Sequence, residues 1–582
     1  MRFQSGRKAR PASQRSIILA PCAALLFACM STTLAAETKP VARSVVTASH
    51  GMVATSQPLA VQAGLGVLKA GGNAADAAIA ADAMLGLVEP MSCGIGGDLF
   101  VMYWDAKTSK LYGLNASGRS PYAIDRDVFR QKGLKEIPLN GPLSWSVPGC
   151  VSGWDELSRR FGTRNLGDLL VPAIERAEEG FAVTPIISQS WQTTEPDLVS
   201  WPDSVTTYLP GGRAPRAGEI FHNPNLAASY RLLAKDGPDA FYRGPIAEKI
   251  VAFSHANGGY FEPRDFADHR SDWIEPVSTT YRGYRVWELP PNGQGIAVLE
   301  MLNLLEPFNL NALGPCSPQY LHLLVEAKKL AFADRARFYA DPAFSPAPVS
   351  TLISKSYADS RRRLVNLNHA ATDFPAGDPK LATSDRHGDK IYLTVVDKDR
   401  NCCSFIQSNF EPFGSKVVPG EVGFCLQNRG NLFALADNHP NRLEPHKRPF
   451  HTIIPGFVTE HDKPWLCFGV MGGDMQPQGQ VQVLVNLIDF GMNLQQAGDA
   501  ARMRHDGSPT PTGLPAEPRG GTVFVEAGIP DQTLAALRAK GHQVARDKPT
   551  VFGGYQAILI DWKTGQLQGA SDIRKDGCAM GY

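Results

Sequence analysis

The stretch "GDKIYLTVVDKDRN", residues 388–401, is typical of one arm of a β-hairpin. Ile391, Leu393 and Val395 alternate with more polar neighbours, which is the period-two pattern of a strand with one buried face. The polar run "DKDRN" then turns the chain. The strand begins on Lys390, and the sequence on either side of this lysine indicates both a fold and a chemistry that would need a hydroxyl group at that position.

Upstream of this strand, the pattern predicts helices interrupted by hairpins. Residues 57–90 are expected to form two helices, the second opening on Asn73 as its N-cap, and residues 92–121 a glycine turn followed by a β-hairpin. An amphipathic helix is expected over about 320–339. The stretch 354–389 loses periodicity towards its end, which favours a mobile linker leading into Lys390.

Downstream, the sequence becomes rich in strand patterns. Hairpins are expected at 390–409 and 452–471, then a helix over about 478–505 and a final strand pair. The composition, 43% hydrophobic and 20% charged, is that of a soluble globular protein. We found no internal repeat or low-complexity tract.

The first 36 residues have the features of an export signal. They contain five basic residues and no acid, then the apolar run "IILAPCAALLFACM" and small residues that suit cleavage after Ala35 or Ala36. Because five positive charges leave with this segment, the formal charge of +1 becomes −4, so neither nucleic acid nor an anionic membrane is indicated as a partner. We expect a periplasmic protein without stable membrane insertion after cleavage; a membrane-anchored N-terminus and a lipid anchor on Cys29 are the alternatives.

Common metal and nucleophile signatures are missing. Eight of the ten cysteines lie outside the signal and form no CxxC pair, so buried free thiols are expected. His439, His446 and His451 crowd one loop without the spacing of a metal site and are interpreted as surface or pocket histidines. No GxSxG or HExxH occurs, and we expect neither metal nor cofactor.

Several segments together resemble one family in order and context. They are "SCGIGGDLF" (92–100), "SWSVPGCVSGW" (144–154), "AFYRGPIAEKI" (240–250), "ELPPNGQG" (288–295), "ADRARFYADPAF" (333–344), "IYLTVVDKDRN" (391–401), "FGSKVVPGEVGFCLQNRG" (413–430) and "VMGGDMQPQG" (470–479). From about Ser49 to the C-terminus the chain is similar to the gamma-glutamyltransferase (gamma-glutamyltranspeptidase, glutathione hydrolase) family, and in particular to a bacterial branch of it.

The resemblance implies an α/β (α+β) fold, the αββα four-layer sandwich of N-terminal-nucleophile hydrolases. Such proteins are made as proenzymes that cut themselves before a threonine, whose hydroxyl then attacks a gamma-glutamyl amide. The freed α-amine acts as its base, for which a pKa of about 7.7–8.0 is well matched. Residues 45–389 would correspond to the large subunit and residues 390–582 to the small subunit.

The resemblance also implies a set of site residues. Gly472 and Gly473 would supply oxyanion-hole amides, although a hairpin terminus explains a glycine pair equally well. Arg119 falls where the family holds a substrate carboxylate, a task that suits a guanidinium. Further positions that would support the nucleophile or face the substrate are Ser408, Asn409, His451 and Thr452.

The sequence departs from the family at the nucleophile. The family's Gly-Asp-Thr reads Gly388-Asp389-Lys390 here, and a lysine side chain has no hydroxyl to start self-cleavage. Thr394 lies about 13 Å further along the strand, whereas Thr383 and Ser384 would have to cut at their own junction. A Lys390 ε-amine with a depressed pKa is a chemical alternative, but a degraded catalytic position is the interpretation we favour.

A second departure concerns the substrate. Where the family has acidic residues for the glutamyl α-amino group, this chain has Arg429, Asn431 and Leu432. A cationic side chain repels an ammonium group, so an acyl group without that amine, as in glutaryl-type acylases, is favoured. Arg400 also replaces a turn glycine, at some conformational cost.

Three functional hypotheses follow. The first is a family proenzyme that stays a single chain with weak or no hydrolysis and transfer of gamma-glutamyl amides. The second is an active glutathione hydrolase or glutaryl/cephalosporin-type acylase with an unrecognised nucleophile, and the third is a periplasmic pseudoenzyme that binds gamma-glutamyl peptides. Each takes a small-molecule acyl-amide as its partner, and the sequence does not indicate an oligomeric state.

Overall fold

The computed structural model describes residues 43–378 and 389–582, with the backbone alone for residues 389 and 390. The predicted signal with Cys29, and the linker residues Thr383 and Ser384, lie outside the described residues. Within the described ranges, no helix combines the length and the apolar character needed to span a bilayer.

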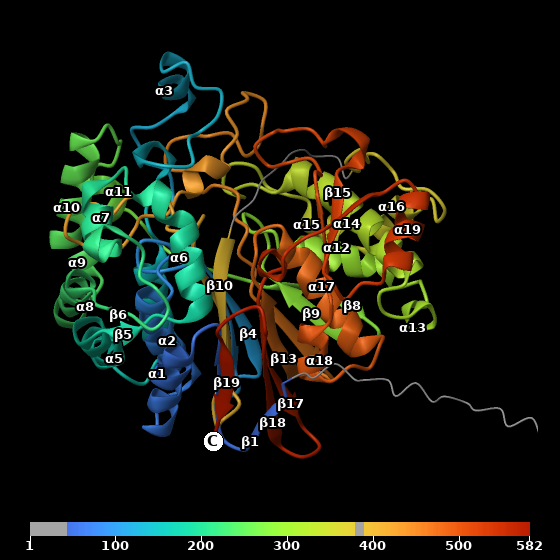
Figure 1. Cartoon of the computed structure of the whole chain (residues 1–582), viewed down its shortest axis with the longest axis horizontal. Helices are drawn as coiled ribbons and strands as arrows, with labels where there is room; N and C mark the ends of the chain where they lie inside the picture. The colour runs from blue at the N-terminus through green and yellow to red at the C-terminus, as the bar shows by residue number, and fades with distance from the viewer. Residues whose placement is uncertain (1–42, 379–388) are drawn as a thin grey trace, which may run out of the picture. The chain divides into compact units, whose positions relative to one another are not determined.

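Most strands of the described residues form two seven-stranded sheets, which pack face to face in the centre of Figure 1. In spatial order, the first sheet contains β19 (Cys578–Gly581), β2 (Met52–Thr55), β10 (Asp389–Val396), β11 (Cys402–Phe410), β3 (Asp98–Asp105), β4 (Lys110–Ala116) and β7 (Asp272–Ile274). The second contains β1 (Val46–Ala48), β18 (Gln566–Ser571), β17 (Tyr555–Asp561), β13 (Lys463–Val470), β12 (Gly456–Glu460), β9 (Tyr284–Glu288) and β8 (Val277–Tyr281). Both sheets therefore combine strands from before and after residue 390.

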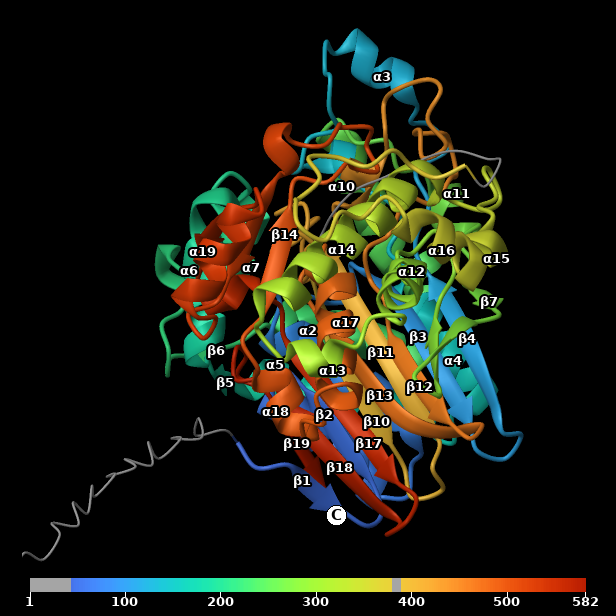
Figure 2. The ribbon, with the colours of Figure 1, turned by 90° about the vertical axis from the view of Figure 1, so that its right-hand side faces the viewer.

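Helices cover the outer face of each sheet, as Figures 1 and 2 show. On the side of the first sheet and in its neighbourhood lie α1 (Pro58–Lys69), α2 (Ala74–Val88), α4 (Cys150–Phe161), α5 (Leu166–Glu179), α6 (Pro185–Leu198), α7 (Pro202–Tyr208), α8 (Pro224–Asp236), α9 (Asp239–Tyr242), α10 (Pro245–Ala256) and α11 (Pro263–Ala267). On the side of the second lie α12 (Ile296–Leu305), α13 (Leu310–Leu313), α14 (Pro318–Phe338), α15 (Val349–Leu352), α16 (Lys355–Arg362), α17 (Met475–Ile488), α18 (Leu494–Asp499) and α19 (Asp531–Ala539). The short helix α3 is Arg126–Gln131.

The apolar core has three layers that follow from strand alternation. On β10, Ile391, Leu393 and Val395 pack in the core shared with α1 and α2, whereas Tyr392 and Val396 point into the core between the two sheets. A third core joins the outer face of the second sheet to α12, α14 and α17. This arrangement confirms the predicted αββα sandwich, because each sheet buries both of its faces.

The same arrangement corrects two expectations. Strand β10 was expected to bury one face, but residues 391–397 are all buried because a sheet inside four layers has no solvated face. The helix expected over about 320–339, α14, is likewise buried almost all round rather than amphipathic. Alternation therefore identified the strand correctly but did not indicate which faces are buried.

The C-terminal region was only partly predicted. The helix expected over about 478–505 is two helices, α17 and α18, followed by β14 (Met503–Asp506). β14 pairs with β15 (Thr522–Val525) and β16 (Gln543–Arg546) in a separate small sheet. The final strand pair is present as β17 and β18, and β19 follows it. A fourth, two-stranded sheet joins β5 (Phe181–Ala182) to β6 (Ile220–Phe221).

The N-cap predicted at Asn73 is confirmed and can be tested. Its side chain accepts hydrogen bonds from the backbone N–H groups of Ala75 and Asp76, and the Asp76 carboxylate accepts the N–H of Asn73. We expect Asn73→Ala to lower the free energy of unfolding by about 1–2 kcal/mol, measured by urea denaturation. Gln62→Ala, on the exposed face of α1, should stay within about 0.5 kcal/mol; equal losses would contradict the assignment.

Candidate functional site

The backbone of residue 390 lies at the start of β10, against β11. Asp389 pairs with Phe410 and Ile391 with Gln407, so the register shifts between them and residue 390 lies opposite Ser408 and Asn409. The Ser408 hydroxyl accepts the backbone N–H of Phe410 at 2.8 Å. The Asn409 amide donates to the Cys93 carbonyl at 2.9 Å. The structure thus brings the predicted nucleophile position together with two of the predicted neighbours.

The glycine pair lies in the turn from β13 into α17. Gly472 and Gly473 have φ angles of +112° and +62°, a region that favours glycine. A Cβ atom on Gly472 would lie 3.1 Å from the Cα of Gly553. Both glycines line an open cavity of about 540 Å³, together with Asp474 and Ser508 among others. The sequence therefore needs glycine here for its backbone conformation, whatever further role the amides have.

A buried network supports this turn. The Arg335 guanidinium, on α14, donates to the two carboxylate oxygens of Asp474 at 2.6 and 2.9 Å and to the side-chain oxygen of Gln294 at 2.6 Å. The Gln294 amide donates in turn to the carbonyls of Thr452 at 2.8 Å and Gly473 at 3.0 Å. The network joins the predicted glycines to Thr452.

Neither Gln294 nor Asp474 was among the site residues predicted from the sequence. Both residues fall inside segments that carried the family resemblance, "ELPPNGQG" and "VMGGDMQPQG", and that was the available signal. Arg335 is completely buried and paired with the Asp474 carboxylate.

His451 is completely buried, so it is not a surface histidine. Its Nε2 lies 3.0 Å from a carboxylate oxygen of Asp98, and its ring lies 4.8 Å from that of Phe100. Asp98 also accepts the backbone N–H groups of Gly118 and Gly149. Burial raises the pKa of Asp98 to about 6 although these hydrogen bonds oppose the rise. This pair holds the loop that carries Thr452.

Arg429 is fully buried beside Thr452. Its Nη1 donates to the Thr452 hydroxyl at 3.1 Å, and its guanidinium lies over the Phe410 ring at 5.0 Å from the ring centroid. The positive charge of Arg429 also partly opposes the raised pKa of Asp98. A cation is therefore held among the predicted substrate-facing residues.

Two predicted residues make contacts elsewhere. The Arg119 guanidinium donates to the carbonyl of Arg270 at 3.2 Å and lies 3.5 Å from the Asp272 carboxylate. The Asn431 amide donates to the carbonyl of Ile137. Neither residue lines the cavity at the glycine pair, and the same holds for Ser408, Asn409, Arg429, His451 and Thr452.

The turn at 94–97 and the cysteines have structural explanations. A Cβ on Gly96 would lie 2.0 Å from the Cys425 carbonyl oxygen, and one on Gly97 2.4 Å from that of Ser408. Close packing of backbone therefore requires these glycines. The eight cysteines of the described ranges are all free thiols, six of them buried, as predicted.

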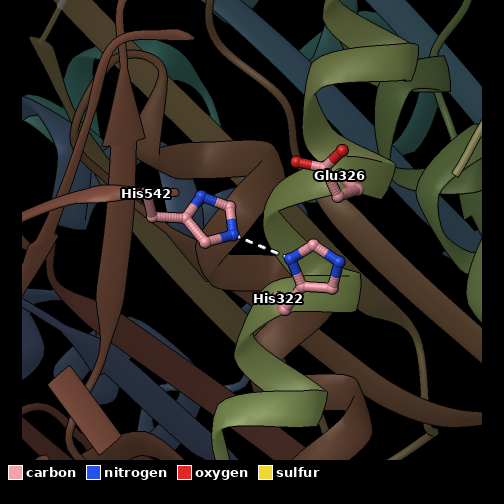
Figure 3. A group of neighbouring side chains, drawn as sticks. All are labelled: His322, Glu326 and His542. Atoms are coloured by element: carbon pink, nitrogen blue, oxygen red, sulfur yellow. Dashed lines mark hydrogen bonds between the residues drawn. The ribbon is translucent and has the colours of Figure 1, made fainter. Parts of the chain in front are cut away.

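His322, Glu326 and His542 form a buried group on and beside α14 (Figure 3). The facing ring nitrogens of the two histidines are 2.8 Å apart and share a hydrogen bond, and His322 Nε2 lies 2.8 Å from the carbonyl of Asn366. The Glu326 carboxylate is paired with the Lys329 ammonium at 3.1 Å. Since these groups are occupied by one another and Lys329 would repel a cation, we assign them a structural role.

Two helix-covered sheets, with residue 390 at the start of a central strand and a glycine pair at the end of β13, define the class: an αββα sandwich of the N-terminal-nucleophile hydrolase type. The chain belongs to the gamma-glutamyltranspeptidase family, whose model, described as "Gamma-glutamyltranspeptidase", matches residues 60–582.

Three relatives illustrate this membership. The "Glutathione hydrolase-like YwrD proenzyme" of Bacillus subtilis (strain 168) is 39% identical over 91% of this chain and 98% of its own. The "Acylase ACY 1 proenzyme" of Pseudomonas sp. (strain SE83) is 36% identical over 91% and 93%. The crystal structure of cephalosporin acylase from Bacillus halodurans has a TM-score of 0.86 and 42% identity, covering 94% of this chain and 98% of that one.

Proposed function

We propose that this protein is a member of the gamma-glutamyltranspeptidase family that stays a single chain and hydrolyses acyl-amides weakly or not at all. The observation that carries the proposal is the residue at position 390. The strand start that the family resemblance assigns to a threonine nucleophile carries a lysine instead.

The chemistry of self-cleavage explains why this one residue matters. The hydroxyl of a family threonine attacks the preceding carbonyl, and the cut that follows frees an α-amine. Lys390 has no hydroxyl, so the chain is not cut and no α-amine is released. The protein then lacks both the nucleophile and the base with a pKa of about 7.7–8.0 that would activate it.

The surroundings of position 390 support a retained binding scaffold rather than a collapsed one. Gly472 and Gly473 keep left-handed conformations and still line an open cavity, as oxyanion-hole amides would require. The buried hydrogen bonds from Gln294 to the carbonyls of Gly473 and Thr452 hold the glycine turn next to the loop that carries Thr452. We propose that Gly472 and Gly473 bind the amide oxygen, with Ser408, Asn409, His451 and Thr452 shaping the acyl site, and that Arg119 and Asn431 contact the more distant end of a ligand.

The direct test is the intact mass of the exported wild-type protein after prolonged incubation. We expect one mass that corresponds to the chain without its signal, and amide hydrolysis near background. Two masses that correspond to fragments ending at residue 389 and beginning at residue 390 would overturn the proposal. The same sample reports location, because export to the periplasm with cleavage after Ala35 or Ala36 predicts recovery in the periplasmic fraction without a lipid on Cys29.

For the acyl group, we propose a dicarboxylic, glutaryl-like chain without an α-amine. Arg429 supports this choice, since its buried charge next to Thr452 makes an ammonium group unfavourable there. The family includes the Pseudomonas relative named as an acylase.

Substrate preference tests this choice in a Lys390→Thr background, where turnover can be measured. We expect glutaryl p-nitroanilide to be preferred over gamma-glutamyl p-nitroanilide by at least about tenfold in kcat/KM, equivalent to about 1.4 kcal/mol. Arg429→Gln should narrow the difference, because the repelling charge is removed. A preference for the gamma-glutamyl compound in both backgrounds would contradict a role for Arg429 in selection.

A further inference from the structure

A lysine and a serine form a hydrogen-bonded pair at the cavity that Gly472 and Gly473 line. Ser508, just after β14, is one of the lining residues. Lys328 lies behind it on α14 and is completely buried. Its Nζ is 2.8 Å from the Ser508 hydroxyl oxygen. A base that is sheltered from solvent and touches the hydroxyl of a serine in a cavity wall is the arrangement that nucleophilic catalysis by serine requires.

The remaining contacts of Lys328 orient it towards the serine. His505 Nε2 lies 2.7 Å from the Gly520 carbonyl oxygen, so this nitrogen is the donor and Nδ1 is left as an acceptor. Lys328 Nζ donates to that Nδ1 at 3.1 Å. The aromatic face of Phe332 lies 4.0 Å from Nζ on a further side. The two N–H groups of a neutral Lys328 amine can face the His505 Nδ1 and the Phe332 ring. The lone pair of the amine can then point at the Ser508 hydroxyl.

The charges around Lys328 favour a neutral amine near pH 7. Burial lowers its pKa to about 7, and the charges of Arg335 and Lys329 act in the same direction. Asp474 and Asp506 act in the opposite direction but do not restore the usual value. Burial and Lys328 itself hold the pKa of His505 well below its ordinary value, so this imidazole stays neutral and accepts.

We propose that Ser508 and Lys328 form a second acyl-transfer site, in which Ser508 is the nucleophile and Lys328 its base, and that the site takes short-chain carboxylic esters. This activity goes beyond the amide chemistry of the family and does not depend on residue 390. The cavity of about 540 Å³ is in the size range of small-molecule sites. The Gly472–Gly473 backbone forms part of the same wall.

The proposed reaction balances without a cofactor. The Ser508 oxygen bonds to the ester carbonyl carbon while its proton moves to Lys328 Nζ. The carbon–oxygen bond to the alcohol then breaks, and the alcohol leaves with the proton from the Lys328 ammonium. Water attacks the acyl-serine and gives one proton to Nζ; Ser508 takes that proton back as the acid leaves. One ester and one water become one acid and one alcohol.

Thr510 provides a matched control within the cavity. It also lines the wall, but its hydroxyl donates to the Leu514 carbonyl at 3.0 Å and accepts the Leu514 N–H at 2.8 Å. A threonine hydroxyl without a lysine partner should not be activated. Comparing the reactivity of Ser508 with that of Thr510 therefore distinguishes activation by Lys328 from the effect of merely lining the cavity.

The test uses the full exported protein and diisopropyl fluorophosphate, whose phosphorus accepts the serine oxygen as fluoride leaves. We expect one adduct per chain, mapped to Ser508 by peptide mass spectrometry. Ser508→Ala should abolish it, and Lys328→Met should slow labelling at least about a hundredfold. Thr510→Ala, which removes a hydroxyl that has no lysine partner, should keep its adduct on Ser508. Absence of an adduct, or an adduct on another residue, would overturn the proposal.

The pH dependence distinguishes a base from a structural lysine. Labelling should rise with pH and reach half of its maximum near pH 7, where neutral Lys328 forms. A rate unchanged by Lys328→Met in a variant with wild-type thermal stability would overturn the role of the lysine. The outcome is separate from the proposed function, because labelling concerns Ser508 whereas the intact mass concerns the 389/390 bond.

Discussion

Lys390→Thr is expected to turn a single exported chain into two chains that meet at the 389/390 bond. The substitution restores the hydroxyl that attacks the preceding carbonyl, and the cut frees the α-amine that then acts as base. We expect amide hydrolysis to rise at least about a thousandfold above the wild type. Intact mass gives the two fragments, and release of p-nitroaniline gives the rate.

Two features of the structure around this position favour the gain in activity. Position 390 lies opposite Ser408 and Asn409 in the sheet. The Gln294 amide donates to the carbonyl of Gly473 in the glycine turn at 3.0 Å and to that of Thr452 at 2.8 Å. The parts that would be needed besides the nucleophile are therefore held in place by hydrogen bonds. A positioned site requires little further reorganisation.

Lys390→Met is the matched control, since it has a similar length, no hydroxyl and no charge. It should stay a single chain with background activity. If Lys390→Thr also stays a single chain although it is folded, then the scaffold has lost more than its nucleophile and the binding function alone would remain. If the wild type splits, a chemistry of Lys390 itself must be considered.

The elements with strong local signals could be predicted from the sequence. The N-cap at Asn73 and the hairpin ends around Asp397 depend on turn and cap chemistry within a few residues, and both were placed correctly. Arg400 has a φ of +68°, as a residue in a glycine position of a turn would. The two-sheet sandwich came from the family resemblance, because alternation cannot say which strand faces are covered by other layers.

The polar network below the glycine turn could not be predicted. It joins α14, the loop at residue 294 and the start of α17, which are far apart in sequence. In the sequence Arg335 is one of several basic residues on this helix, and only the fold brings it to Asp474. Lys328 and Ser508 were missed for the same reason, since 180 residues separate them.

The second large effect, on stability, is expected at the buried ion pair of Arg335 and Asp474. Asp474→Ala leaves Arg335, which is completely buried, without the carboxylate that accepts two of its hydrogen bonds. Removing one partner of a buried ion pair costs about 3–5 kcal/mol, so the free energy of unfolding in urea should fall by that amount. Glu275→Gln removes an exposed partner of Lys110, with side chains 77% and 47% exposed, and should cost less than about 1 kcal/mol.

A double variant separates stability from positioning. Arg335→Met with Asp474→Leu removes both charges, so it should be more stable than Asp474→Ala, because the cost of an unpaired charge is gone. In the Lys390→Thr background, however, it should remain poorly active, since Gln294 loses the Arg335 donor at 2.6 Å that orients its bonds to Gly473 and Thr452. Full activity in the double variant would show that the ion pair only stabilises the fold. If the double variant were as unstable and as inactive as Asp474→Ala, the shape of the side chains at positions 335 and 474, rather than their charge, would determine the conformation of the Gly472–Gly473 turn.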